Sequence, residues 1–496
     1  MMSVEVFVPA ADFTARALGA DAVAAAVAAA PGVEVRRTGS RGLYWLEPLV
    51  EVATDAGRIG FGPLDSAAAR ALFANGPPNV DHPDCLGLVD ELPWLEKQSR
   101  VTMARVGVIE PLSIAQYKAN GGFAGLARAR ALTAPAIVET VTDAGLRGRG
   151  GAAFPTGIKW RTVLESEGEP KYIVCNADEG DSGTFADRMI MESDPFSLIE
   201  GMLIAGLAVG ADRGYIYCRA EYPLAIDTLA EAIRLAKGAG YLDDFHLEVR
   251  KGAGAYICGE ETSLLESLEG KRGVIRYRPP LPAVKGLFGQ PTVVNNVISL
   301  ASVPAILAQG ADHYRSFGVG RSRGTLTVQL AGNVRRGGLF EVPFGKPLRW
   351  VVERLGGGTA SGLPIKAVQV GGPLGAHIPP QHFDTPLDYE SFQAIGGMIG
   401  HGGLVVFDET ADMGAMARYA FEFCAEESCG KCTPCRIGAV RGVEVVDRIR
   451  RGEAAADNRV LLKDLCHTMI DGSLCGLGGM APLPVLSVMT HFADEL

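Results

Sequence analysis

Three closely spaced cysteines near the end of the chain constrain its fold and chemistry more than any other feature. Residues 427–436 read ESCGKCTPCR, which places Cys429, Cys432 and Cys435 in a Cys-x2-Cys-x2-Cys run. Because a tight turn leaves thiols at this spacing pointing inward, they can converge on one centre. The run resembles the cysteine pattern that holds one face of a [4Fe–4S] cluster, which needs a fourth thiolate from elsewhere. It therefore predicts that the chain handles electrons.

The fourth thiolate is expected from the segment SLCGLGG, which contains Cys475. The glycines of this segment let the backbone wrap around a bulky cluster. Cys466 is the alternative fourth ligand. A structural zinc site is the competing interpretation of the run, but zinc sites more often pair two separated Cys-x2-Cys knuckles, so we favour iron.

Length and charge narrow the class of protein. A chain of 496 residues has room for several domains. Its net charge of −10, without a basic stripe, argues against nucleic acid as a partner. No apolar run approaches the roughly 20 residues that a bilayer span needs, and the N-terminus lacks the features of a signal peptide. The ten cysteines form no disulfide-like framework, which favours a reducing, cytoplasmic compartment.

Residues 1–91 are expected to form a small α/β domain. Alternating and β-branched segments predict strands at 4–8, 32–37, 49–53 and 58–61, with helices at 22–30 and 66–75. This mixture is compatible with a thioredoxin-like fold. The unit contains one cysteine, Cys85, and so can hold neither a Cys-x-x-Cys redox pair nor a cluster. We interpret it as a docking domain that carries no electrons.

A larger α/β domain is expected over residues 92–323. Strands at 172–175, 215–218 and 245–250 alternate with helices at 201–210 and 224–237, and a further helix is predicted at 297–307. Such alternation predicts a parallel, doubly wound, Rossmann-like sheet. The first strand runs directly into NADEGD at 176–181, and polar residues at the carboxyl end of a parallel strand mark the ligand site of open α/β sheets.

The remainder of the chain is expected to form two more domains. Residues 324–410 predict a β-grasp (ubiquitin-like) unit, with strands at 325–331, 339–342, 367–370 and 404–407 and a helix at 347–355. Residues 411–496 predict four helices, at 411–427, 433–452, 457–470 and 481–496. Helices joined by short loops suggest a four-helix bundle, with the cysteine run between its first two helices.

Two glycine-rich segments are candidates for binding a phosphate. The first spans 145–160 and the second reads GAGAYICGEE at 252–261. Neither is a complete Gly-x-Gly-x-x-Gly fingerprint, and either one alone could be a plain turn. Together they favour an anion site, since glycines let backbone N–H groups approach a phosphate. Arg149 and Lys159 are expected to supply the countercharge.

Carboxylates in the NADEGD stretch at 176–181 and at the end of the second glycine-rich segment would repel a phosphate. They are Asp178, Glu179, Asp181, Glu260 and Glu261. We expect them to accept hydrogen bonds from sugar hydroxyls or a nicotinamide amide, which favours NAD over NADP. The alternative for each is an exposed loop end or a helix cap. Because a cluster moves single electrons and a nicotinamide moves a hydride, the chemistry also requires a flavin between them.

With these motifs together, the chain resembles the flavin- and NADH-binding subunit of respiratory complex I and its soluble relatives. The resemblance rests on RGRGG at 147–151, CNADE at 175–179, GAYICGEE at 254–261, VNN at 294–296 and the cysteine run. It implies a [4Fe–4S] cluster on Cys429, Cys432, Cys435 and Cys475. It implies NAD(H) stacked over the flavin near Phe154, with Glu179 and Asp181 near the nicotinamide and Glu261 as a further contact. The implied FMN contacts are Gly148, Gly150, Gly151, Lys159, Asn176, Asp178, Tyr256, Gly259, Glu260, Asn295 and Asn296.

The chain departs from the family pattern at four positions. Relatives usually have glycine where this chain has Ala153 and glutamate where it has Asp181. Thr162 and Leu281 stand where aromatic rings around the adenine are expected. The loss of both rings predicts weaker stacking on the adenine.

The N-terminal domain and the segments after it narrow the family resemblance. A thioredoxin-like domain fused ahead of the flavin domain is more similar to the soluble relatives than to complex I. Residues 90–98 and 107–113 resemble the joining segment of the β (diaphorase) subunit of molybdenum-containing, NAD-dependent formate dehydrogenases. This implies a hetero-oligomer with a [2Fe–2S] thioredoxin-like small subunit and a large, formate-oxidising molybdenum subunit. The flavin subunit of complex I or of an NAD-reducing hydrogenase is the alternative, and a zinc-binding scaffold without redox chemistry is a distant third.

Overall fold

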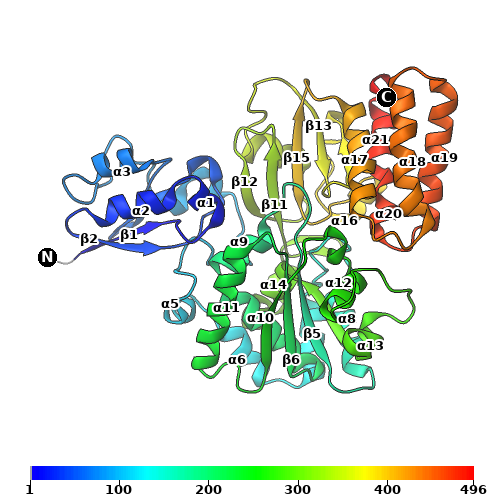
Figure 1. Cartoon of the computed structure of the whole chain (residues 1–496). Coiled ribbons are helices and arrows are strands. Elements are labelled where there is room, and N and C mark those ends of the chain that lie inside the picture. The colour runs from blue at the N-terminus through cyan, green and yellow to red at the C-terminus, as the bar shows by residue number, and fades with distance from the viewer. Residues whose placement is uncertain (1–2) are drawn as a thin grey trace.

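The computed structural model of the protein describes residues 3–496. Figure 1 shows an N-terminal sheet on one side, a central parallel sheet below, a second sheet above it, and a bundle of helices at the C-terminal end. This is the mixed α/β architecture with a helical C-terminal region that the sequence predicts. In the part of the chain that is described, no helix combines the length and apolar character needed to cross a membrane.

The N-terminal sheet has the strand order β2-β1-β3-β4. Strand β1 runs parallel to β2 and antiparallel to β3, and helices α2 and α3 pack together. Val6 and Val8 of β1 are fully buried, because alternate residues of a strand face the helices. The fold matches the predicted thioredoxin-like domain. The bounds are β1 Val4–Val8, α1 Phe13–Ala17, α2 Ala20–Ala28, β2 Val33–Arg37, β3 Val50–Thr54, β4 Gly57–Phe61 and α3 Ser66–Leu72.

The central sheet is fully parallel, with the order β7-β6-β5-β8. Its strands are β5 Tyr172–Ala177, β6 Arg213–Cys218, β7 His246–Lys251 and β8 Thr292–Asn296. The chain adds β6 and β7 on one side of β5 and then returns to place β8 on the other. The sheet therefore reverses its direction of growth between β5 and β8, and ligands of open parallel sheets bind in the crevice at such a point. Strand β8 was not predicted from the sequence pattern.

Two buried helices cover one face of the central sheet. They are α10 Pro195–Val209 and α14 Val297–Gln309, and they pack tightly because Gly201 of α10 lies against the carbonyl of Leu300. Ile173 and Cys175 of β5 face this core, whereas Tyr172 and Val174 face the opposite one. The neighbouring helices are α5 Ile114–Ala119, α6 Ala124–Arg130, α7 Ala134–Asp143, α8 Thr156–Glu165, α9 Ala186–Ser193, α11 Pro223–Gly238 and α12 Glu261–Leu268.

The upper sheet has five strands in the order β12-β11-β15-β13-β14. Strands β11 and β15 pair in parallel and the others are antiparallel, which fits the predicted β-grasp domain. The predicted helix at 347–355 is shorter, Trp350–Leu355. Leu43 and Leu92, from the N-terminal region, lie in the same core. The strands are β11 Thr325–Gly332, β12 Gly338–Pro343, β13 Ile365–Val370, β14 Ala376–Ile378 and β15 Gly403–Asp408.

The C-terminal unit contains the four predicted long helices and one short helix, α20. They are α17 Met413–Glu427, α18 Thr433–Arg450, α19 Ala455–Gly472, α20 Gly476–Met480 and α21 Pro482–His491. The cysteine run straddles the start of α18, because Cys432 caps this helix and Cys435 lies inside its first turn. The bundle shares one core with the second face of the central sheet, including Val174 and Val294. The cysteines are thereby held close to the sheet.

The close contact between α10 and α14 gives a first test. A Gly201→Ala change would drive its Cβ into the Leu300 carbonyl, and overpacking of this kind costs about 1–3 kcal/mol. We expect a fall of several degrees in the melting temperature. Gly238→Ala is the matched control, because Gly238 is also helical but has open space around it, and a small gain is expected there. Equal melting temperatures for the two variants would contradict the tight packing.

Candidate active site

A cavity of about 600 Å³ opens at the point where the central sheet reverses direction. Pockets of this size suit a cofactor or a small substrate. Its wall combines the ends of β5 and β8, both glycine-rich segments, loops of the upper sheet and helix α20. The structure therefore brings all of the predicted FMN- and NAD(H)-contacting residues to one cavity. They are Gly148, Gly150, Gly151, Phe154, Lys159, Asn176, Asp178, Glu179, Asp181, Tyr256, Gly259, Glu260, Glu261, Asn295 and Asn296.

The first glycine-rich segment lies close to the end of β8. A Cβ added at Gly150 would come within 3.0 Å of the Asn296 Cβ, so only glycine leaves this approach open. Gly151 has a φ of 108°, which favours glycine. Ala153 has a φ of 53°, so this alanine occupies a left-handed conformation. This segment forms part of the cavity wall with its backbone.

Arg149 does not supply the predicted countercharge. Its guanidinium donates to the Tyr314 hydroxyl at 2.9 Å and to the Arg323 carbonyl at 2.8 Å, on the far side of the segment from the cavity. The prediction was wrong because these long-range partners hold the guanidinium, and Arg149 does not line the cavity. Lys159 is different. Its ammonium lines the cavity, where it donates to the Val294 carbonyl at 2.9 Å and pairs with Glu261 at 3.0 Å.

The end of β5 presents an unsatisfied carboxyl group to the cavity. Asn176 donates to the Gly259 carbonyl at 2.8 Å and is thereby fixed. Asp178 Oδ2 is buried and finds no hydrogen-bond partner among residues 3–496. Burial raises the pKa of Asp178 to about 7, against a smaller lowering by Arg219. An orphaned buried oxygen at a cavity wall fits a ligand that donates hydroxyl groups, as the ribityl chain of FMN does.

The second glycine-rich segment places its carboxylates in different roles. Glu260 caps α12 by accepting from the Thr262 and Ser263 amides at 2.9 and 3.0 Å. Its side chain thus has the helix-cap role that was the alternative to ligand binding. Glu261 pairs with Lys159. Asp181 accepts from the Tyr256 hydroxyl at 2.7 Å, and burial raises the pKa of this carboxyl group although Tyr256 opposes the shift.

Three apolar or small side chains surround the cavity mouth. Phe154 and Leu281 are 49% and 50% exposed, and Thr162 lies beside them on α8. An exposed Phe154 ring is available to stack on a flat ligand. Thr162 and Leu281 offer no ring, so Phe154 is the aromatic side chain among these three.

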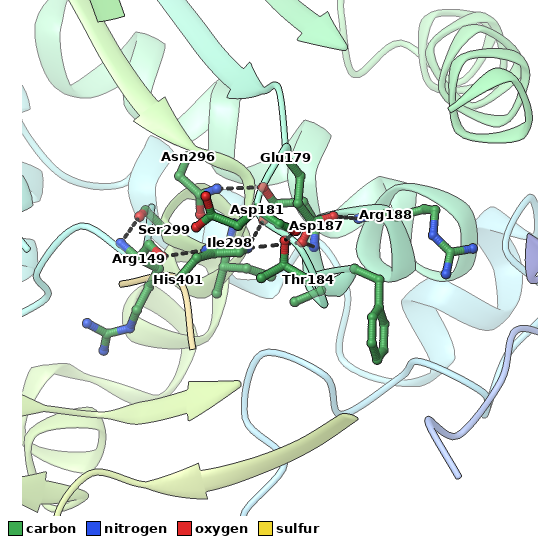
Figure 2. A network of polar contacts seen from close by, with 12 residues as sticks. Arg149, Glu179, Asp181, Thr184, Asp187, Arg188, Asn296, Ile298, Ser299 and His401 are labelled. Atoms are coloured by element: carbon green, nitrogen blue, oxygen red, sulfur yellow. Dashed lines mark hydrogen bonds and ion pairs between the residues drawn. The ribbon is translucent and has the colours of Figure 1, made fainter. Parts of the chain in front are cut away.

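Glu179 belongs to the cavity wall and is almost completely buried. It accepts from the amides of Asp187 and Arg188 at 3.1 Å each, which closes the N-terminus of α9. The ring of His401 lies 3.1 Å from Glu179 and 3.3 Å from Asp187 (Figure 2). Asp187 also accepts from the side chain of Asn296 at 2.6 Å.

His401 and Asp187 belong to the site but were not predicted from the sequence. His401 precedes β15, more than two hundred positions from Glu179, and no local pattern marks it. Asp187 falls in a helix that the sequence analysis did not predict. The signal that could have found it is its place near the end of β5, where polar residues gather at parallel-sheet sites.

The cysteines gather at the junction of α17, α18 and α20. Cys435 Sγ lies 3.2 Å from Ser428 Oγ, and its contact with Cys424 lowers the pKa of Cys435 to about 6. Cys424 Sγ lies 3.8 Å from Cys435 Sγ, and Cys429, Cys432 and Cys475 pack against the same core. This contact and burial raise the pKa of Cys424 well above its ordinary value. A Cβ at Gly478 would strike Cys435, so the glycine-rich loop after Cys475 closes against the run. This donor set fits a cluster.

Cys466 occupies a different environment from Cys475. It is fully buried in α19, and burial alone raises its pKa to about 12. Cys475 caps α20, and its pKa is raised to about 11 by burial and then by Glu260 and Cys435. The geometry therefore favours Cys475 over Cys466 as the fourth ligand.

The cysteine loop and the cavity share a wall. Gly476 and Leu477, which follow Cys475 directly, line the cavity together with Met480. The Tyr256 amide donates to Glu427 at 3.0 Å, and the Tyr256 ring lies 4.9 Å from Phe423. A cofactor in the cavity is therefore separated from a cluster on these cysteines by little more than one layer of protein.

A cofactor cavity beside a four-cysteine centre defines the class, a flavin and iron–sulfur oxidoreductase subunit. Residues 141–305 match the Nuo51 FMN-binding domain, and residues 415–496 match the iron–sulfur binding region of NADH-ubiquinone oxidoreductase-F. The chain belongs to the family of complex I flavin subunits and their relatives, which confirms the resemblance drawn from the motifs. Its cofactors are FMN, a [4Fe–4S] cluster and NAD(H), and it is an NAD(H)-dependent oxidoreductase.

Individual relatives are similar over most of their length. The NADP-reducing hydrogenase subunit HndC of Solidesulfovibrio fructosivorans is 46% identical over 408 residues, which cover 81% of this chain and 83% of the relative. An NADH-quinone oxidoreductase subunit of Rhizobium meliloti is 44% identical over 404 residues, 80% of this chain and 96% of the relative. A crystal structure of an NAD+-reducing [NiFe]-hydrogenase has a TM-score of 0.72 and 32% identity, and covers 100% of this chain and 85% of the hydrogenase chain.

The two candidate fourth ligands can be told apart by mutation. Cys475→Ala should lower the iron content and the visible absorbance of the cluster, because one iron loses its thiolate. Cys466→Ala is the matched control, since it removes a buried thiol from the same bundle without touching the centre. FMN content should be unchanged in both. Full cluster content in Cys475→Ala, with loss in Cys466→Ala, would reverse the assignment.

The orphaned carboxyl group of Asp178 predicts a pH-dependent effect of FMN. With its folded-state pKa at about 7 because of burial, above the value of 3.8 for a free side chain, Asp178 destabilises the cofactor-free protein as pH rises from about 4 through 7. Hydroxyl donors of FMN would relieve this penalty, so the thermal shift caused by FMN should grow between pH 6 and 8.

Asp178→Asn provides the comparison for this pH effect. Loss of a hydrogen bond to a charged group costs about 1.5–3 kcal/mol, or roughly ten- to a hundredfold in affinity for FMN at pH 8. The variant should also lose the growth of the thermal shift with pH. A shift that grows equally in both proteins would mean that Asp178 does not contact the cofactor.

Proposed function

We propose that this chain is the diaphorase subunit of a hetero-oligomeric, NAD-dependent formate dehydrogenase. The observation that carries the electron-transfer role is the wall shared by the cavity and the Cys475 loop. In this role the subunit takes single electrons at the cluster and delivers them as pairs to NAD+, and NADH oxidation uses the same residues in reverse. A cytoplasmic location is part of the proposal, supported by ten unpaired cysteines within the described residues.

FMN, when bound, supplies the exchange between a hydride and two single electrons. The chain's own residues position it. Asp178 and Asn176 receive the hydroxyl groups, the backbone of the first glycine-rich segment approaches the phosphate, and Lys159 contributes the positive charge. Tyr256 stands between the cavity and the cysteine loop. No side chain needs to act as general acid or base, because hydride transfer at a flavin requires orientation and exclusion of water.

NAD(H) is proposed to enter over the flavin from the cavity mouth. Phe154 is the exposed ring available to it, and Asp181 and Glu261 are the carboxylates of the cavity wall that are proposed to contact it. The carboxylate of Glu179 is engaged by α9 and His401, so we propose that it acts on the nicotinamide side through its position and charge. Carboxylates at this end of the cavity disfavour an added 2′-phosphate, which supports NAD over NADP.

Formate as the electron source rests on the joining segments at 90–98 and 107–113, and on the N-terminal domain without a cluster. The proposed partners are a [2Fe–2S] thioredoxin-like subunit and a large molybdenum subunit. An NAD-reducing hydrogenase is the second candidate, favoured by the hydrogenase structure that covers the whole of this chain.

Substrate tests on the complex purified with this chain separate the two candidates. Formate-dependent reduction of NAD+, with molybdenum in the preparation, is expected. Hydrogen-dependent reduction with nickel in its place would select the hydrogenase. Neither activity, with NADH oxidation by an artificial acceptor intact, would move the chain to a complex I assembly. A preparation without FMN or iron would refute the diaphorase role itself.

A further inference from the structure

His401 reaches three other segments of the chain from the loop ahead of β15. Its Nδ1 lies 2.6 Å from the carbonyl oxygen of Arg149, in the first glycine-rich segment. Its Nε2 lies 3.1 Å from Glu179, after β5, and 3.3 Å from Asp187, in α9. The ring is 6% exposed and lines the cavity. Figure 2 shows it between these groups, beside Asn296 and Asp181.

The partners of the ring determine where its protons must be. A carbonyl oxygen only accepts, so Nδ1 carries a proton. Both groups facing Nε2 are carboxyls, which also only accept when they are ionised. A neutral ring would turn a lone pair toward them. The contacts are therefore satisfied by an imidazolium, and Asp187 and Glu179 outweigh the effect of burial and raise the pKa of His401 well above its ordinary value.

The surroundings on the other elements do not supply an equivalent cation. The Arg149 guanidinium points away toward Tyr314. Arg188, the residue after Asp187, extends toward the N-terminal domain and donates to Thr14 at 2.7 Å. Asp181 adds another acidic group nearby, and Tyr222 donates to Glu179 at 3.0 Å as a neutral hydroxyl. His401 is thus the cation in direct contact with both carboxylates.

We propose that His401 is a positioning residue of the flavin site, whose imidazolium joins Glu179 to Asp187 and balances their charge beside the bound FMN. The proposal rests on FMN occupying the cavity. Through Asp187, the ring fixes the Asn296 side chain, which lines the cavity at the end of β8. The positive charge of the imidazolium changes the net charge of the triad of His401, Glu179 and Asp187 from −2 to −1.

The charge has a measurable consequence for the flavin. Two electrons added to a cofactor are less stable beside extra negative charge, so loss of the imidazolium should lower the midpoint potential of FMN. At low pH a proton on one of the carboxyls can replace the lost charge. Burial raises the pKa of Asp187 to about 6 even with His401 opposing it, and the pKa rises further once the cation is removed. The potential difference from the wild type should therefore be small near pH 6 and full near pH 9.

Three variants test this effect, because each sets a different net charge on the triad or restores the wild-type charge in the purified complex. His401→Gln makes the triad more negative and should disfavour flavin reduction about tenfold near pH 9, which is about 30 mV for two electrons. Asp187→Asn removes one negative charge and should shift the potential upward. The double variant restores the wild-type charge and should return the potential toward the wild-type value. The readout is a spectroelectrochemical titration of FMN at pH 6 and 9, with FMN content measured in each protein.

His377→Gln is the matched control. His377 is also buried, in β14 of the upper sheet, with its ring centroid 5.7 Å from that of Phe407, and it does not line the cavity. The midpoint potential of FMN in His377→Gln should equal that of the wild-type protein. If FMN is bound and its midpoint potential is unchanged in His401→Gln and Asp187→Asn, this inference is overturned but the proposed function is not. A divalent metal beyond the cluster iron that is lost in His401→Gln would also overturn it, since the triad would then be a metal site. A wild-type protein without FMN would overturn the proposed function as well.

Discussion

The parallel pairing of β5 with β8 is the constraint on which the rest of the structure depends. Asn176 pairs with Asn296, so the polar ends of two strands that are far apart in the sequence lie next to each other. The order of the strands reverses at this pair, and open parallel sheets bind their ligands at such a point. The two glycine-rich segments line the cavity, and the bundle packs against the same sheet. The cavity and the cysteines are neighbours as a result of strand order.

The N-terminus of α9 is where the upper sheet meets this arrangement. Its first amides have no acceptor within the helix, and side chains from two other segments satisfy them. The side chain of Gln329 in β11 accepts hydrogen bonds from the amides of Phe185 and Ala186 at 2.5 and 2.8 Å. Glu179 accepts from the next two amides of the chain. The upper sheet thus contributes both His401 and Gln329 to this side of the cavity. Its position relative to the central sheet is determined by polar contacts as well as by apolar packing.

Local patterns predicted most of the fold and much of the site. The Cys429–Cys435 spacing and the glycine-rich segments are readable because their geometry is set within a few residues. Strand β8 was missed because its five residues run straight into the α14 helix, which dominates the pattern. The direction of Arg149 and the role of His401 could not be read from the sequence, since both depend on contacts across more than 150 positions. The sequence indicates which groups are available, and the fold decides which of them meet.

Helix α9 also has a second end, and it is attached to the N-terminal domain. Glu192 accepts from the Phe13 amide at 2.8 Å, and Arg188 donates to Thr14. One helix of eight residues therefore contributes Asp187 to the flavin cavity and also contacts the N-terminal domain. Displacement of that domain would remove these two contacts from α9, the helix that also supplies Asp187 to the cavity wall.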